Sequence, residues 1–532
     1  MKKYQRSNRR YFIGALVTIL ISTFFEVVLQ FFKGDVLDHA VAGEIQKTIY
    51  YAVSLVGFIL LSCLFYFLYK RISAKFLVSC TKELKCDVFV AVLKRSFVAY
   101  KEHPQGEYIA KYTSEVDTIK ERRFAMLTVF WEILFKIIFV SVALFVLDWH
   151  IAIITIVLLT TPLYIPKLIE KRLQNAQSAY FDAVEKNLAK VNDWFSGFEI
   201  IKNFSIEHKI IEKFKDSNNE TMDKLLKDTQ LGVLSQLITT LISYLSYFIV
   251  LTCATWLVIR GDFSAGDFFV AIGMIDQLSY PLISLAGITR QLISIKPVCR
   301  RMEIFFNLPE SSQSGEAITS LDRDVCFKNV SFAYDGERFV LNQLNLTIEK
   351  GKRYLLKGPS GCGKTTAINL LLKYYDATDG NIEIDGIPLL KIGSAYKLIT
   401  VVRQEAILFN DTLRNNLTMY QKVSDGRLLE VLNNVGLDKY ANTQALNGII
   451  MENGANFSGG EKKRICLARA LLRDTDVLIL DEPLANLDSV TAERIEDLLL
   501  SIQNKTILVV SHQFTDEKLC RFDKVLDFAS TK

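Results

Sequence analysis

Residues 354–366 read Tyr354-Leu-Leu-Lys-Gly358-Pro-Ser-Gly-Cys-Gly-Lys364-Thr-Thr366. The stretch starts as an apolar strand, passes through a glycine-rich turn and enters the helical pattern of residues 367–374. Glycines in such a turn let backbone N–H groups converge on phosphate oxygens, and the dipole of the following helix favours the same anions. The stretch therefore predicts a phosphate-binding loop in its strand–loop–helix setting.

This loop supplies candidate ligands for a nucleoside triphosphate and its metal ion. We expect the Lys364 ammonium to reach the β- and γ-phosphates and the Thr365 hydroxyl to ligate Mg²⁺. The rest of the predicted cradle consists of Gly358, Ser360, Gly361, Gly363 and Thr366.

A second motif, Asp476-Val-Leu-Ile-Leu-Asp481-Glu482-Pro483, places two carboxylates at the end of an apolar strand. Open α/β sheets bind their ligands at this edge. We expect Asp481 to complete the magnesium site and Glu482 to act as general base toward the attacking water. Strand and helix patterns alternate from Val325 to the C-terminus, which predicts an α/β domain with a parallel sheet.

The N-terminal half has a different composition. Hydrophobic residues make up 50% of the 532-residue chain, although 23% of its residues are charged. Six apolar runs are long enough to cross a bilayer, for which about 20 residues suffice; they are 11–32, 48–69, 124–147, 151–169, 231–259 and 266–288. We predict an all-α six-helix transmembrane domain at 1–306, a polar linker at 307–320 and the α/β domain at 321–532.

Basic residues set the predicted orientation. They cluster before the first run, at Lys2, Lys3 and Arg6, and again after the second run, whereas the segments assigned outside carry few. The N-terminus and the α/β domain are therefore expected in the cytoplasm. Helical periodicity continues through the two long inner connections, so we expect helical arms that extend beyond the membrane. The nine cysteines form no CxxC pair, and a disulfide framework is not expected.

The stretch Phe457-Ser-Gly-Gly-Glu-Lys-Lys-Arg464 resembles the signature motif of ATP-binding-cassette proteins. Other family elements follow in the expected order: Gln404 resembles the Q-loop, Asn486-Leu-Asp488 the D-loop and His512 the switch histidine. Tyr334 resembles the aromatic residue that stacks on adenine. The signature departs from the commonest form at Phe457 and Glu461, but the phosphate-facing Ser458, Gly459 and Gly460 are retained.

The membrane half resembles that of exporter-type half-transporters of the same family. Gly106 and Glu107, followed by Asp117, resemble the first cytoplasmic arm, and residues 197–207 resemble the second, whose turn forms a coupling helix. Trp149, Pro162, Glu452 and Gly454 also resemble exporter positions. The resemblance thus spans nearly the whole chain.

The resemblance implies that two cassettes meet head to tail and enclose two ATP molecules. Each ATP would lie between Lys364 of one chain and Ser458 to Gly460 of the other, with Asp488 nearby. Gln404 would contact Mg²⁺ and, with Glu482 and His512, support hydrolysis. The turns near Asp117 and Lys202 would transmit the closing of the two cassettes to the membrane-spanning helices.

Charged residues within the predicted spans include Glu26, Glu132, Lys136 and Asp276, and Arg290 lies near the inner end of the last span. Glu132 and Lys136 are spaced i,i+4, so we favour mutual neutralisation for that pair. For Glu26 and Asp276 a structural role and a place on a cavity wall have equal weight. We hypothesise that Asp276 faces the translocation route.

The predicted function is ATP-driven export of a hydrophobic or amphipathic compound (peptide, lipid or drug) by a dimer in a bacterial plasma membrane. An importer on the same scaffold and one half of a heterodimer remain alternatives, although intact Lys364, Glu482 and His512 favour a homodimer. Six spans argue against a soluble cassette ATPase, and we expect no nucleic-acid partner. A leader-peptide-processing transporter is disfavoured because no protease-like segment precedes the first span.

Overall fold

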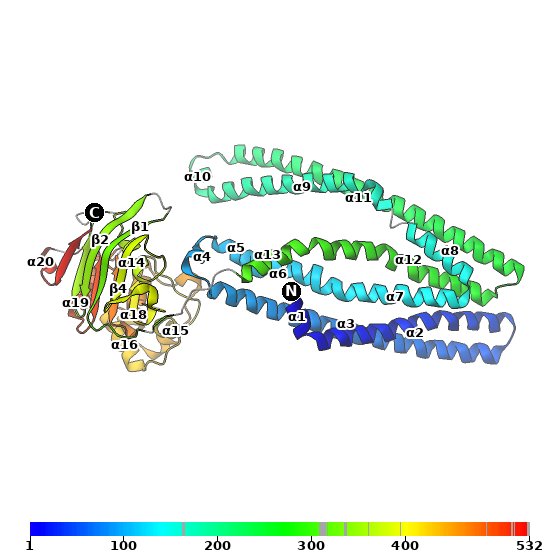
Figure 1. The fold of residues 1–532 in the computed structure, drawn as a ribbon, viewed down its shortest axis with the longest axis horizontal. Coiled ribbons are helices and arrows are strands. Elements are labelled where there is room, and N and C mark those ends of the chain that lie inside the picture. Colours follow the sequence, from blue (N-terminus) through cyan, green and yellow to red (C-terminus); the bar gives the residue numbers. More distant parts are fainter. Residues whose placement is uncertain are drawn as a thin grey trace. The chain divides into compact units, whose positions relative to one another are not determined.

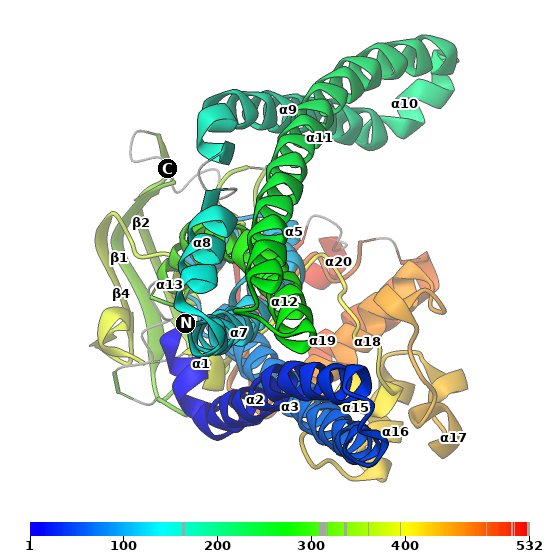
Figure 2. The same cartoon turned by 90° about the vertical axis from the view of Figure 1, so that its right-hand side faces the viewer.

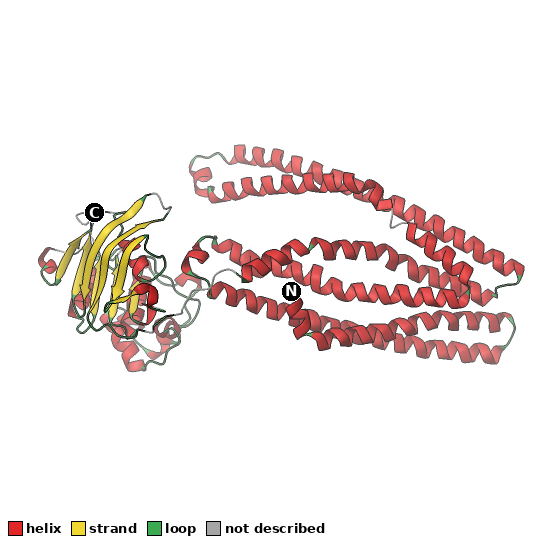
Figure 3. Ribbon diagram, in the orientation of Figure 1, coloured by secondary structure: helices red, strands yellow, loops and turns green. Residues whose placement is uncertain are grey.

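The structure is a computed structural model that describes residues 1–161, 165–307, 315–316, 318–334, 338–359, 361–393, 395–485, 487–511, 514 and 516–528. The chain divides into two compact units. The helical unit comprises Met1–Leu93 and Pro104–Asn307, and the α/β unit comprises Lys94–His103 and Leu308–Lys532. Of the predicted linker, residues 308–314 and 317 lie outside the described part. The predicted order of an all-α part followed by an α/β part is confirmed (Figure 3).

The helical unit is built of long helices (Figure 1). In chain order they are α1 (Lys2–Ser7), α2 (Arg9–Val41), α3 (Ile45–Leu93), α5 (Gln105–Ala110), α6 (Val116–Ile119), α7 (Met126–Leu147), α8 (Trp149–Thr160), α9 (Ile165–Ser196), α10 (Phe198–Asn203), α11 (Glu207–Arg260), α12 (Ala265–Ser294) and α13 (Lys296–Phe306). Among the described residues, five helical segments are long and apolar enough to cross a membrane, and Trp149–Leu158 is a shorter apolar helix. That shorter helix lies in the fourth predicted span, whose residues 162–164, including Pro162, are outside the described part.

The predicted cytoplasmic arms are direct continuations of membrane helices. Helix α11 has 54 residues, which corresponds to about 80 Å at 1.5 Å per residue and far exceeds a hydrocarbon core of about 30 Å. Its polar part runs beside α9, and the short helix α10 closes this second arm (Figures 1 and 2). Lys202 lies within α10, so the predicted position of the second turn is confirmed.

The first arm turns at a different place from the one predicted. Its turn contains helix α4 (Phe97–Lys101), which Ser96 caps by accepting from the Ala99 N–H and which ends just before Pro104. Asp117 instead lies in α6, inside a continuous helical stretch that includes two π-helical segments, Lys111–Glu115 and Lys120–Ala125. The prediction of a turn near Asp117 is therefore wrong. No proline or glycine interrupts residues 107–125, and the capping Ser96 lies well upstream.

The predicted Glu132–Lys136 pair is also wrong. Lys136 on α7 donates to Glu26 on α2 across 2.7 Å, whereas Glu132 accepts from the Tyr69 hydroxyl at 2.8 Å and from Lys70 at 3.2 Å, both on α3. Glu132 and Lys136 lie on the same face of α7, but two different helices, α3 and α2, pack against that face. Each charge is thus neutralised across a helix interface, which gives Glu26 a structural partner.

Helices α2 and α12 cross at small residues. A Cβ on Gly34 would lie 2.5 Å from Val270 Cγ2, and one on Gly266 would lie 2.4 Å from the Gly34 carbonyl oxygen. The same approach lets Asp38 on α2 accept from Ser264 Oγ and from the Gly266 N–H, both at 2.6 Å. Asp38 therefore satisfies a backbone donor at the start of α12, beside the capping box formed by Ser264 and Asp267.

The α/β unit contains two sheets. Strands β6 (Ile399–Val402), β7 (Val477–Asp481), β8 (Thr506–Val510), β3 (Arg353–Lys357) and β9 (Lys524–Asp527) form a five-stranded parallel sheet in that spatial order. This confirms the predicted parallel sheet. An antiparallel sheet of β2 (Phe339–Glu349), β1 (Asp324–Ala333), β4 (Asp379–Ile384) and β5 (Ile387–Pro388) was not predicted.

The α/β unit also contains helices, which contribute to two hydrophobic cores. They are α14 (Lys364–Leu371), α15 (Leu413–Thr418), α16 (Asp425–Asn434), α17 (Thr443–Leu446), α18 (Gly459–Leu472), α19 (Ser489–Ser501) and α20 (Asp516–Leu519). Every residue of β7 and β8 is buried, so both strands lie inside the sheet with covered faces. The carboxyl ends of β3 and β7, which carry the two predicted motifs, are separated by one strand, β8.

Candidate functional site: a nucleotide-binding cassette

The phosphate loop joins β3 to α14 as predicted. Gly358, Gly361 and Gly363 have φ values of 142°, 80° and 102°, a region that glycine adopts without strain. A Cβ on Gly363 would also lie 2.5 Å from Leu341 Cδ2. The Lys364 ammonium lies within the loop, where it donates to the carbonyls of Gly358 at 2.6 Å and Pro359 at 3.0 Å. Ser360, a predicted member of the cradle, is outside the described residues.

Three predicted magnesium ligands line one cavity of the α/β unit. Thr365, Gln404 and Asp481 all contribute to its wall, and its volume is about 1070 Å³. Their hydroxyl, amide and carboxylate oxygens form a hard donor set that suits Mg²⁺. Burial raises the pKa of the Asp481 carboxyl, an effect that the Arg403 guanidinium and the Lys364 ammonium oppose.

The predicted general base lies next to this group. Gln404 Nε2 donates to Glu482 Oε2 across 2.9 Å, which orients the carboxylate. Glu482 has a φ of 52°, and its N–H donates to the Val510 carbonyl at the end of β8. A non-glycine residue in the left-handed region costs roughly 1–3 kcal/mol and is frequent at functional sites. The turn thus holds Glu482 at the edge of the sheet.

Tyr334 and Thr366 meet behind the loop. The Tyr334 hydroxyl lies 3.2 Å from Thr366 Oγ1, and its ring packs edge-on against Phe332 and Tyr375 at centroid distances of 4.8 and 5.2 Å. Tyr334 as a residue nevertheless remains 54% exposed. An oriented and accessible aromatic residue is what stacking on a base requires.

The signature forms the start of α18. Ser458 is the N-cap: its hydroxyl accepts from the Glu461 N–H, and the Glu461 carboxylate accepts from the Ser458 N–H at 2.8 Å. Although burial opposes the shift, Lys439 and the Ser458 N–H lower the pKa of Glu461 to about 2. Glu461, which departs from the commonest signature, therefore forms a capping box with an ionised carboxylate. Phe457, the other departure, packs against the ring of Tyr440 at 5.0 Å.

The structure describes only some of the remaining residues that were predicted for the nucleotide site and its surroundings. Asp488 is the N-cap of α19 and accepts from the Thr491 N–H at 2.9 Å, which lowers the pKa of its carboxyl. Glu452 and Gly454 form one turn of 3-10 helix ahead of α18. Asn486 and His512 lie outside the described residues.

Sequence reasoning missed a second set of residues near the nucleotide site. Phe97 of α4 stacks on Tyr374 with a centroid distance of 3.8 Å and an angle of 10°, and it meets Tyr375 edge-on at 6.2 Å. Arg403 lies over Tyr374 at 5.5 Å and donates to Asn369 Oδ1 at 2.7 Å. Phe97 and Arg403 also line the cavity of the magnesium ligands. In the sequence, the N-cap Ser96 and Pro104 lie on either side of α4, and they could have indicated that the chain turns there.

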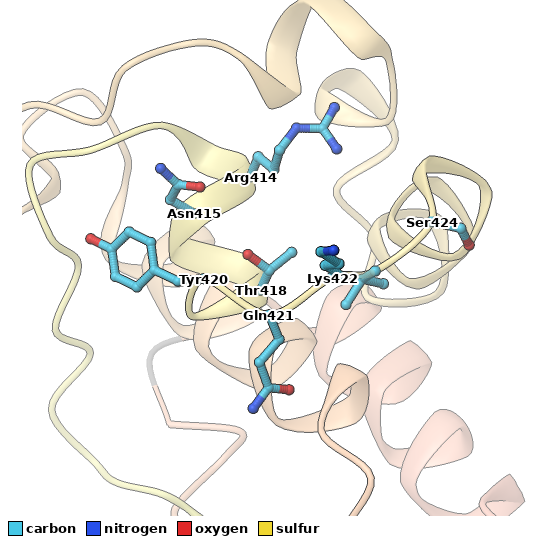
Figure 4. A pocket seen from close by; sticks show the side chains of 8 residues that line it. Arg414, Asn415, Thr418, Tyr420, Gln421, Lys422 and Ser424 are labelled. Carbon is cyan, nitrogen blue, oxygen red and sulfur yellow. The ribbon is translucent and has the colours of Figure 1, made fainter.

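A second hollow of about 520 Å³ lies beside α15, and most of the residues that line it are polar (Figure 4). The described residues that line it are Arg414, Asn415, Thr418, Tyr420, Gln421, Lys422, Val423 and Ser424. No residue predicted for the nucleotide or the metal is among them. The hollow shares Thr418, Gln421 and Val423 with the cavity of the predicted magnesium ligands, so the two adjoin.

Family comparisons agree with this geometry. The family model of the ABC transporter transmembrane region matches residues 11–282, which are 272 of the 532 residues. The ABC transporter model matches residues 341–485. The chain belongs to the ABC transporter family. It is an integral membrane protein that binds ATP and couples ATP hydrolysis to transport.

Curated relatives place this ABC transporter among exporters. It is 26% identical over 531 residues to the ATP-dependent lipid A-core flippase of Syntrophus aciditrophicus, covering 96% of this chain and 87% of the relative. It is 29% identical over 458 residues to the multidrug resistance-like ATP-binding protein MdlB of Buchnera aphidicola, covering 82% and 76%. The predicted exporter-type half-transporter architecture is thereby confirmed.

A solved structure shows the same fold along the whole transporter. It is described as a bacterial Atm1-family ABC exporter with ATP bound, and it superposes with a TM-score of 0.81 over 98% of this chain and 93% of that chain. The sequence identity is 21%, so the likeness concerns the fold.

Proposed function

We propose that this ABC exporter works as a homodimer that moves a hydrophobic or amphipathic compound out of a bacterial cell across the plasma membrane. The names of its relatives, a lipid A-core flippase and a multidrug resistance-like protein, support amphipathic cargo and export. The positive residues at the N-terminus and after the second span support a cytoplasmic N-terminus and a cytoplasmic α/β unit. An importer on the same scaffold is the alternative, and the direction of transport in inverted vesicles distinguishes the two.

The observation that carries the dimer is the exposed start of α18. Ser458 and Gly459 are exposed to solvent, and the N-terminus of a 14-residue helix offers backbone donors and a favourable dipole to an anion. Each chain has one phosphate loop and one signature. Two chains related by a twofold axis would form two equal composite sites, each with Lys364 from one chain and Ser458 to Gly460 from the other.

The same proposal assigns roles within each site. Tyr334 stacks on adenine, the phosphate loop holds the triphosphate, and Thr365, Gln404 and Asp481 hold Mg²⁺. Bound Mg²⁺ would screen the phosphate charge. Glu482, oriented by Gln404, accepts the proton of the attacking water. His512 contacts the γ-phosphate, and Asp488 lies at the junction of the two cassettes.

Two short helices are proposed to link the cassettes to the membrane helices. Helix α4 packs within the α/β unit of its own chain through Phe97. Helix α10 instead exposes Phe198, Ile200 and nearby Phe204 by 60%, 61% and 73%. Three large apolar side chains at the end of a polar arm suit a protein contact. We assign that contact to the α/β unit of the partner chain.

Composite sites predict complementation between two defective chains. Lys364→Met removes the phosphate lysine, and Ser458→Arg blocks the signature. Each variant alone is expected to be inactive, because both sites of its homodimer carry the defect. A dimer of one chain of each kind has one site with both defects and one intact site. Co-reconstituted in nanodiscs, the pair should regain the ATP hydrolysis that neither variant shows.

The measurement is phosphate release from tagged heterodimers, purified in two affinity steps and compared with both homodimers. Size-exclusion chromatography checks that each variant chain is folded. Heterodimers as inactive in ATP hydrolysis as the two homodimers would contradict the composite site. A wild-type chain that folds but never hydrolyses ATP alone would instead favour a heterodimer with a second half-transporter.

Phe97 is predicted to couple ATP binding to the helical unit. Phe97→Ala removes the ring stacked on Tyr374, a contact of a kind worth about 0.5–1.5 kcal/mol beyond its buried area. ATP affinity should be retained, because Phe97 is not one of the predicted nucleotide ligands. The ATP-induced change in hydrogen exchange of α7 should be lost. Phe97→Tyr keeps the ring and should therefore retain the ATP-induced change in hydrogen exchange. If Phe97→Ala showed the same ATP-induced change as the wild type, the coupling role would be contradicted.

A further inference from the structure

The two departures in the signature contact the same short segment of the chain. This segment is η6 (Asp438–Tyr440), one turn of 3-10 helix that follows α16. The Phe457 ring packs against the Tyr440 ring at a centroid distance of 5.0 Å. The Glu461 carboxylate accepts from the Tyr440 hydroxyl at 3.3 Å and lies 2.5 Å from Lys439 Nζ. Neighbouring residues of η6 therefore hold both unusual side chains of the signature.

The capping box at the start of α18 uses two of the four N–H groups that have no acceptor within the helix. The Ser458 N–H donates to Glu461 Oε2 at 2.8 Å, and the Glu461 N–H donates to Ser458 Oγ at 3.3 Å. The N–H groups of Gly459 and Gly460 lie between them and also have no acceptor within the helix. In the composite site proposed above, these two donors would bind the γ-phosphate of an ATP held by the other chain.

The Glu461 carboxylate puts a second anion at this helix start. The carboxylate is ionised, and its side chain is only 11% exposed, so salt and water screen its charge weakly. It would repel a γ-phosphate at Gly459 and Gly460, because a helix dipole that favours each anion does not remove the repulsion between the two. The commonest signature has a neutral glutamine at this position and avoids the conflict. In this chain a cation beside Glu461 would remove it.

Lys439 supplies that cation. Among the described residues, no other Lys, Arg or His nitrogen lies within 4.0 Å of the Glu461 carboxylate. The Lys439 side chain is 66% exposed, and an exposed lysine gains little from a pair unless its geometry is held. Here Asp438, the residue before it, accepts from Arg494 of α19 at 3.2 Å. Lys439 Nζ also lies over the Tyr440 ring, 4.7 Å from its centroid. The segment that carries the cation is thus anchored on both sides.

We propose that Lys439 is a positioning residue for ATP hydrolysis: it neutralises Glu461 and so lets the start of α18 receive the γ-phosphate of an ATP held by the other chain. The proposal rests on the composite site proposed above. Lys439 acts through Glu461 and does not itself bind the nucleotide. A glutamine at position 461 forms the same type of capping box without a charge. Lys439 is therefore needed only while residue 461 is a glutamate.

The first test is a double-mutant cycle in the full chain in nanodiscs. The measured quantity is the ATP concentration at which cross-linking of two chains, the measure of closure, is half-maximal. Lys439→Gln should raise this concentration roughly threefold to tenfold, the range expected for one charge at a helix end. In the Glu461→Gln background the same substitution should change it by less than about twofold. An unchanged concentration in Lys439→Gln, or an equal rise in both backgrounds, would overturn the proposal.

Two further variants separate the charge from the loss of an ion pair. Lys439→Arg keeps the charge and should close at the ATP concentration of the wild type. Lys328→Gln is the matched control, because Lys328 lies 2.6 Å from Glu383 and the two side chains are 58% and 17% exposed. That pair lies on the antiparallel sheet, so its loss should leave closure unchanged. Thermal unfolding checks that every variant is folded. An equal effect of Lys328→Gln and Lys439→Gln would overturn the specific role of Lys439.

The second test places Lys439→Gln on one chain of the mixed dimer described above. The intact site of that dimer takes its phosphate loop from the Ser458→Arg chain and its signature from the Lys364→Met chain. On the Lys364→Met chain the substitution lies beside the intact signature and should raise the ATP concentration for half-maximal hydrolysis. On the Ser458→Arg chain it lies beside the blocked signature and should have no effect.

The two placements distinguish a role at the partner's ATP from a general defect of the chain. An equal response to both placements, in a mixed dimer that is otherwise active, would overturn the role of Lys439 and leave the composite site standing. A mixed dimer that is inactive even without Lys439→Gln would contradict the composite site itself, on which the proposal rests.

Discussion

Glu482→Gln is expected to bind ATP normally and to hydrolyse it about 10²–10⁴-fold more slowly, which is the usual cost of removing a general base. The substitution keeps the size of the side chain and leaves an oxygen that can still accept from Gln404 Nε2, now 2.9 Å from the carboxylate. The left-handed backbone at position 482 is equally strained in both forms. Only the ability to take a proton is lost.

The proposed homodimer should then remain closed on ATP, because in that proposal ATP stabilises the closed state and hydrolysis ends it. Phosphate release measures the rate, and ATP-dependent cross-linking of two chains measures closure. Glu493→Gln is the control, since it changes an exposed glutamate of α19 in the same unit. Turnover close to the wild-type rate in Glu482→Gln would show that another group accepts the proton.

The nucleotide site was predictable because its chemistry is local in sequence. The phosphate loop requires glycine at positive φ and a lysine at the start of the helix, and both occur within nine residues. Asp481 ends a wholly buried strand and Glu482 follows it, so their place at the sheet edge follows from the strand alone. Which strands pair is not local, and the antiparallel sheet escaped prediction for that reason.

The errors in the helical unit have one physical origin. A helical pattern shows which residues share a face but not which helix meets that face. Glu132 and Lys136 do share a face, yet their partners come from α3 and α2. The first turn was placed by resemblance at Asp117, whereas Ser96 and Pro104 bracket the observed one. Phe97 could not be recognised before its ring was seen on Tyr374, far away in sequence.

Lys364→Met is expected to remove ATP binding at working concentrations, with an affinity loss of at least about tenfold, the equivalent of about 1.4 kcal/mol. The Lys364 ammonium is buried, and the carbonyls of Gly358 and Pro359 hold it inside the loop. It is therefore positioned before nucleotide arrives. A methionine fills the same space without the charge that is proposed to bind the β- and γ-phosphates.

A matched control separates the charge from the fold. Lys373 also donates to two backbone carbonyls, those of Ile392 at 2.7 Å and Leu390 at 3.4 Å, but it lies beyond the end of α14. Lys373→Met should lose comparable hydrogen bonds and keep ATP affinity. Binding is measured by titration of a fluorescent ATP analogue, and thermal unfolding checks both proteins. If both variants lost affinity equally, the effect would come from the fold, and the phosphate role of Lys364 would be wrong.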